Sequence, residues 1–169
     1  MNRPLGLIAF VGFFLALLVH ILTLASIDVS SQFPYVWSLH VGMFLVWIPF
    51  VLFERKRFRM QRIRLGEIMS GLPPWASFLV SVAFVYMILN FFLCAHVSGG
   101  GNADIVGGQY VLSSHGRILA HLTENEYHLH RAYEVRMFSG VWLTFYLIPG
   151  IYFLFWREPA SIFPVGIKV

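Results

Sequence analysis

Histidine is the residue type in this sequence with the widest range of possible chemistry, because it binds metal ions and transfers protons near neutral pH. Four of the seven histidines lie within residues 108–140: His115, His121, His128 and His130. His128 and His130 are two residues apart, so on a helix they point about 160° from each other and do not share one ion. The zinc-peptidase spacing, two histidines four residues apart with a glutamate between them, is absent. We therefore expect these four histidines to be solvated or to form turns, with metal binding as the less favoured alternative.

Two further histidines, His20 and His40, lie inside long apolar runs. Ionisable side chains inside a membrane are costly and usually face the interior of a helix bundle or a cavity. His20 continues the face of Gly12 and Ala16, and small residues at this spacing let helices approach each other closely. We therefore expect both histidines to lie between helices.

Other polar residues are expected at a depth similar to that of the two histidines. Asn90 lies in the third apolar run, and Arg136 and Ser139 lie at the start of the fourth. With His20 and His40 they predict a polar layer in the outer half of the bundle, and the favoured interpretation is hydrogen bonding across helices, with no cofactor. Two alternatives remain open. One is ligation of haem b by the two histidines, since bundle cores hold such cofactors; the other is binding of a lipid or quinone headgroup.

The composition places these residues in a membrane. The chain is 58% hydrophobic and only 12% charged, whereas about 25% of the residues of a soluble domain are charged. A hydrocarbon core needs about 20 apolar residues in a helix, and four stretches without Asp, Glu, Lys or Arg meet this length: residues 5–27, 35–53, 75–95 and 137–156. The predicted fold class is an all-α membrane protein. Residues 1–169 form a single domain, a four-transmembrane-helix bundle with a small extracytoplasmic β-hairpin between the third and fourth spans.

The basic residues between the second and third spans predict the orientation, because Lys and Arg near the ends of spans stay in the cytoplasm. The loop 54–74 contains six of them: Arg55, Lys56, Arg57, Arg59, Arg62 and Arg64. We therefore expect this loop and both termini in the cytoplasm, and segment 96–136 outside. The same six cations are candidates for contact with anionic lipid headgroups. Nucleic-acid binding is not expected, because membrane topology alone accounts for the cluster.

The outer segment 96–136 contains several local structure signals. Residues 98–108, SGGGNADIVGG, have the composition of a flexible linker. The dipeptide His115-Gly116 lies between two short apolar runs and is typical of a tight hairpin turn. Thr123 and Glu126 have the spacing of a capping box. We therefore expect a hairpin within residues 109–121, followed by a helix that begins near residue 124 and continues directly into the fourth span.

The same segment resembles a pattern found in other membrane proteins. The His-Gly turn, then LTENEY, then YEVRMFSGVW before the last span resemble uncharacterised multi-spanning bacterial inner-membrane proteins, and WSLHVGMFLVWIPFVL in the second span is similar to their pattern too. The resemblance implies a location in the bacterial cytoplasmic membrane. It implies no activity.

The sequence favours a non-catalytic function. All eight acidic residues lie outside the four spans, so the carboxylate that proton- or cation-coupled transporters usually need is missing from them. Ser113, Ser114 and His115 lack the sequence context of a nucleophile elbow. The predicted function is an accessory or assembly subunit of a larger membrane complex, in contact with lipid and with other membrane subunits. The alternatives are an electron-transfer subunit that binds haem or a metal through His20 and His40, and a lipid- or quinone-binding protein.

Overall fold

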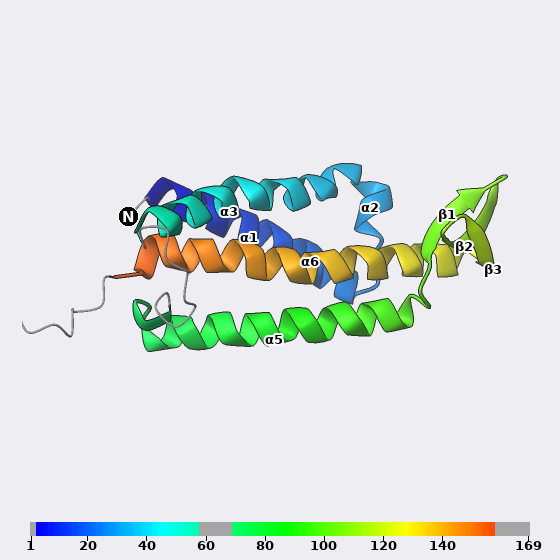
Figure 1. The fold of residues 1–169 in the computed structure, drawn as a ribbon. Coiled ribbons are helices and arrows are strands. Elements are labelled where there is room, and N and C mark those ends of the chain that lie inside the picture. Colours follow the sequence, from blue (N-terminus) through cyan, green and yellow to red (C-terminus); the bar gives the residue numbers. More distant parts are fainter. Residues whose placement is uncertain (1–2, 58–68, 158–169) are drawn as a thin grey trace, which may run out of the picture.

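The structure is a computed structural model that describes residues 3–57 and 69–157, without the side chains of residues 54–57. Four helical segments are long and apolar enough to cross a membrane: α1 (Arg3–Leu24), Pro34–Phe53, α5 (Pro74–Val97) and α6 (Glu124–Phe155). The second segment consists of the 3-10 turn η1 (Pro34–Trp37) and most of α3 (Ser38–Arg57), and the short helix α2 (Val29–Gln32) precedes it. The four predicted spans are confirmed, and the chain is a polytopic membrane protein (Figure 1).

Helix α6 lies at the centre of the bundle. It packs against α1, α3 and α5, whereas α5 packs chiefly on α6, and in Figure 1 α6 runs between α1 and α3 on one side and α5 on the other. In the most apolar window of each helix, 67% of α6 is buried but only 17% of α5. Side chains of α6 are therefore placed to join residues from the three surrounding helices.

Small residues bring α1 close to α6. The buried residues of α1 include Gly6, Ala9, Gly12 and Ala16. The ring of Tyr146 in α6 lies so close to Gly12 that a Cβ atom added at Gly12 would overlap it. The Tyr146 hydroxyl donates a hydrogen bond of 2.9 Å to the Leu39 carbonyl. Since lipid is as apolar as these side chains, close packing and hydrogen bonds, rather than the hydrophobic effect, hold the helices together.

A three-stranded antiparallel sheet connects α5 to α6. Its strands are β1 (Asn102–Val106), β2 (Gln109–Ser114) and β3 (Arg117–His121), in the order β1-β2-β3. The predicted turn is confirmed: His115 and Gly116 join β2 to β3, both with positive φ, 49° and 77°. Positive φ at both central residues matches the twist of a two-residue hairpin.

The expected linker at residues 98–108 was wrong, because it contains β1. Gly107 and Gly108 have φ of 59° and 79° and form a second two-residue turn, after which Gln109 pairs with Val106. Glycine-rich composition fits both a linker and a tight turn, since glycine adopts positive φ freely. The predicted hairpin is therefore two strands of a three-stranded sheet.

The start of α6 has the predicted capping box. The Glu126 amide donates to the Thr123 hydroxyl at 3.3 Å, and the Glu126 carboxylate accepts from the Thr123 amide at 2.7 Å. The helix then continues without interruption for 32 residues. At 1.5 Å per residue it is about 48 Å long, whereas the hydrocarbon core of a membrane is about 30 Å thick. Its first turns therefore extend beyond the core.

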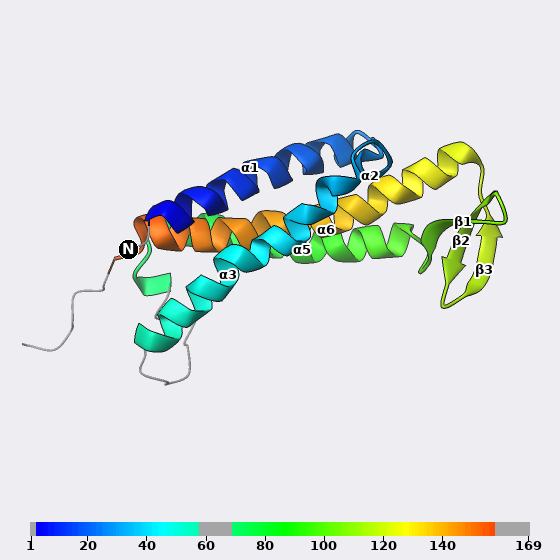
Figure 2. The ribbon, with the colours of Figure 1, turned by 90° about the horizontal axis from the view of Figure 1, so that it is seen from above.

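The sheet is attached to this extension of α6. The Ala103 amide in β1 donates to the Glu134 carboxylate at 2.8 Å, and the ring of Tyr110 in β2 lies 4.8 Å from the ring of Tyr127. Figure 2 shows the sheet at one end of the bundle, beyond the end of α5. We call this end the sheet end, and the opposite end, where α3 ends and α5 begins, the basic end.

Candidate functional site

His20 joins three helices inside the bundle. Its side chain is 3% exposed; Nδ1 lies 2.8 Å from the Ser139 hydroxyl of α6, and Nε2 bonds the Tyr86 hydroxyl of α5. The Ser139 hydroxyl donates its proton to the Arg136 carbonyl at 3.1 Å, so His20 Nδ1 must donate to Ser139. Among the described residues no carboxylate bonds the ring, and in the neutral ring Nε2 then accepts from Tyr86. Both ring nitrogens are satisfied.

Asn90 connects α5 to the same point on α6. Its amide nitrogen donates to the Arg136 carbonyl at 3.0 Å, and its amide oxygen accepts from Arg136 Nε at 3.2 Å. Gly140 makes this approach possible, because a Cβ atom there would lie 2.5 Å from the Asn90 amide nitrogen. We call these residues the polar cluster: His20, Tyr86, Asn90, Arg136 and Ser139.

The structure brings together His20, Asn90, Arg136 and Ser139 as the sequence placed them, and it adds Tyr86. Tyr86 could not be singled out from the sequence, because one tyrosine in an aromatic span equally fits a lipid-facing residue. Buried polar groups in membranes are expensive unless they are paired. The cluster meets this requirement through hydrogen bonds between α1, α5 and α6.

His40 lies outside the polar cluster. Its Nδ1 accepts a hydrogen bond of 3.0 Å from the indole of Trp142, and its ring contacts Phe44, Phe138 and Trp142 edge-on. Trp142 is fully buried. His40 therefore supplies the acceptor that a buried tryptophan needs, on the side of α6 that faces α3.

The two intramembrane histidines have separate partners in the structure, and their ligation of haem stays a prediction. Each axial histidine offers one ring nitrogen to the iron, but both nitrogens of His20 have partners, and His40 contacts a different set of aromatic rings. Within residues 3–57 and 69–157, no group of three or more His, Cys, Asp or Glu side chains is placed to hold a metal ion.

A second polar group lies at the sheet end. Asp28, 6% exposed, follows α1 and accepts a hydrogen bond of 2.8 Å from His128 Nδ1 in the extension of α6. Burial alone would raise the pKa of the Asp28 carboxyl, but hydrogen bonds from His128, Ser31 and Ser30 outweigh burial and hold this pKa below its ordinary value. His128, expected to be solvated, thus has a partner a hundred residues away that the sequence did not indicate.

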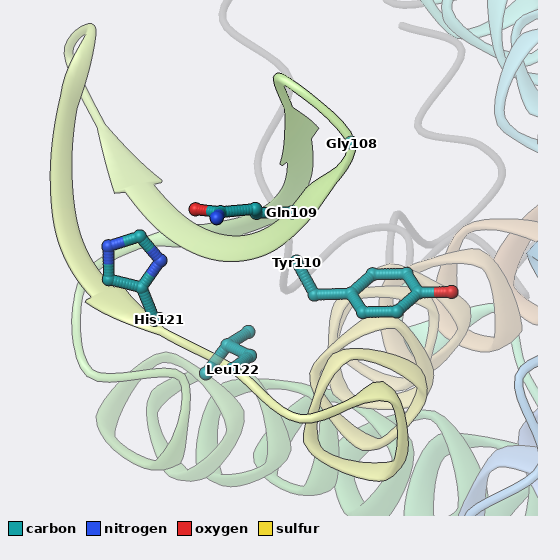
Figure 3. A pocket seen from close by; sticks show the side chains of 5 residues that line it. All are labelled: Gly108, Gln109, Tyr110, His121 and Leu122. Carbon is teal, nitrogen blue, oxygen red and sulfur yellow. The ribbon is translucent and has the colours of Figure 1, made fainter.

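The sheet has a shallow groove and an exposed strand. The groove, about 600 Å³, is lined by Gly108, Gln109, Tyr110, His121 and Leu122. Figure 3 shows Gln109 and His121 on one side of the sheet and Tyr110 pointing the other way, over the first turns of α6. All five residues of β3 are exposed. Sequence reasoning placed a hairpin here but identified no binding surface on it.

The six cations of the loop 54–74 cannot be placed. Arg59, Arg62 and Arg64 lie outside the described residues, as do the side chains of Arg55, Lys56 and Arg57. Their contact with anionic lipid stays a prediction.

No protein-family model, no curated protein and no solved structure matches this chain.

Proposed function

We propose that this polytopic membrane protein is a non-catalytic accessory or assembly subunit of a larger complex in the bacterial cytoplasmic membrane, and that it binds its partner through β3. The observation that carries the proposal is the free edge of the sheet: Arg117–His121 are all exposed, and they are carried beyond the hydrocarbon core on the continuous helix α6. An unpaired strand edge is a ready template for pairing with a strand of another chain.

The two edges of the sheet differ. On β1, the Ala103 amide donates to Glu134 and the Ile105 amide donates to the Asp104 carboxylate, both at 2.8 Å. These bonds occupy two backbone amides of β1, which are then not available to pair with a strand of another chain. On β3, the Leu122 amide donates to the Tyr110 carbonyl at 2.9 Å. Since backbone groups alternate along a strand, those of His121 point away from β2, to the free edge. The alternation is interrupted at Leu119, which has no partner because the register between β2 and β3 shifts there.

The side chains of β3 indicate what kind of segment would pair with it. Ile118 and Leu119 are 49% and 52% exposed. No acidic residue occurs from position 105 to position 122, whereas Arg117 and two histidines do. Complementary charge steers and orients association. The partner segment is therefore extended, apolar in part, and carries at least one carboxylate.

The orientation follows from the cations near the ends of the spans. With the loop 54–74 and both termini in the cytoplasm, the sheet end lies outside, so the partner contributes an extracytoplasmic segment. The polar cluster then has a structural function: it fixes α1 and α5 on α6, which holds the sheet above the membrane.

Site-specific photo-crosslinking in cells tests this proposal. A photoreactive amino acid at Leu119 should form an adduct with one other polypeptide, because this side chain lies at the free edge. The matched control is Val106, which is 45% exposed but lies at the end of β1 and should give little adduct. Equal adducts from the two positions, or none from Leu119, would contradict docking through β3.

A further inference from the structure

Arg136 is a cation at the membrane boundary that has no acidic partner in the described part of the chain. It lies 19 residues before the end of α6 at Phe155, which at 1.5 Å per residue is about 28 Å, close to the full thickness of the hydrocarbon core, about 30 Å. Among the described residues, no carboxylate makes an ion pair with it: Glu134 pairs with Arg131, and Asp28 with His128. A charge at this depth is costly unless an opposite charge approaches it.

The direction of Arg136 is set by its neighbours on α6. Ser139 faces α1, where it bonds His20, and Gly140 faces Asn90 of α5. At 3.6 residues per turn, Arg136 lies between these two directions, about 60° from Ser139 and 40° from Gly140. Its side chain is half-buried. It therefore points between α1 and α5, on the sheet-end side of the bond between His20 and Tyr86.

The hydrogen bond from Arg136 Nε to the Asn90 oxygen fixes the guanidinium. Its two terminal nitrogens, Nη1 and Nη2, have no hydrogen-bond partner among the described residues and are not enclosed. Two such nitrogens at a fixed spacing match two oxygens of a phosphate group. At the boundary of the hydrocarbon core, the phosphate that is always present belongs to a phospholipid headgroup.

We propose that Arg136, oriented by Asn90, binds the phosphate of one phospholipid between α1 and α5 at the sheet end. The bound lipid supplies the negative charge that none of the described side chains provides. The site is separate from β3, so the lipid proposal does not depend on the proposed function.

Native mass spectrometry of the purified full chain tests the site with three probes: phosphatidylglycerol, a diacylglycerol with the same acyl chains but no phosphate, and inorganic phosphate. We expect one phosphatidylglycerol to be retained and the diacylglycerol to be lost. Inorganic phosphate at the same concentration should neither bind nor displace the lipid. Arg136→Gln should weaken phosphatidylglycerol binding at least about tenfold, the effect of losing a charge-assisted hydrogen bond.

Arg117→Gln is the matched control, because it removes the same charge from an exposed position on β3 and should leave lipid binding unchanged. Arg136→Lys keeps the charge but loses the paired nitrogens, and its affinity should fall between those of the wild type and Arg136→Gln. Equal lipid retention by Arg136→Gln, or equal retention of the diacylglycerol, would overturn the proposal. Binding of inorganic phosphate alone would replace the lipid with a soluble anion and would also overturn it.

Discussion

Replacing Gly12 with leucine should cost about 3 kcal/mol of stability, at the upper end for overpacking of a close-packed interface. A Cβ atom at Gly12 already overlaps the Tyr146 ring. The ring has little freedom to move, because its hydroxyl donates to the Leu39 carbonyl and lies 2.5 Å from the position of a Cβ atom at Gly42. The added side chain must therefore push α1 away from α6, which also breaks the bond between His20 and Ser139.

The measurement is the thermal unfolding of the chain in detergent, for Gly12→Ala, Gly12→Leu and the control Val11→Leu. Val11 is 60% exposed, so its substitution should leave the unfolding midpoint unchanged. The midpoints of the two Gly12 variants should be lower than that of the wild type, and Gly12→Leu should have the lower of the two because its side chain is larger. Adding Tyr146→Ala to Gly12→Leu should recover part of the loss, because the leucine then fills the space of the ring. Strictly additive effects of the two substitutions would show that these residues do not meet.

A cysteine at position 114, introduced as Ser114→Cys, should be labelled completely by a membrane-impermeant thiol reagent added outside the cytoplasmic membrane. The position is partly exposed and adjoins the turn between β2 and β3. Cys94, which is 1% exposed, should not react. Pro4→Cys, an exposed position at the basic end of α1, should be labelled only after the membrane is permeabilised. The reverse pattern would invert the proposed orientation and would place β3 in the cytoplasm.

The features of the fold that depend on local sequence patterns were predicted correctly. The four spans follow from the lengths of apolar runs, the turn at His115-Gly116 from the conformational freedom of two residues, and the helix start from the Thr123 and Glu126 spacing. Each of these signals is contained within about one element of secondary structure. The strand β1 was missed because the glycines on either side of it also fit a linker.

Contacts between residues far apart in the sequence were harder to predict from it. The sequence placed His20 and His40 in one polar layer, but the structure turns His40 towards Trp142 and Phe138, because the rotation of each helix about its axis is set by packing rather than by depth. The bond between His128 and Asp28 joins residues a hundred positions apart. It depends on how far α6 extends past α1, which no local pattern specifies.

The central claim is that the chain is a subunit of a larger complex. The most direct test is the mass of the particle that contains the chain after gentle extraction from its native membrane. We expect the wild type to elute in an assembly well above its own 19.4 kDa, together with at least one other polypeptide. His121→Pro should release the chain from that assembly: it removes an outward-pointing amide at the free edge, where proline is tolerated in a strand. Wild-type protein that elutes as a single chain, or only with copies of itself, would contradict the proposed function.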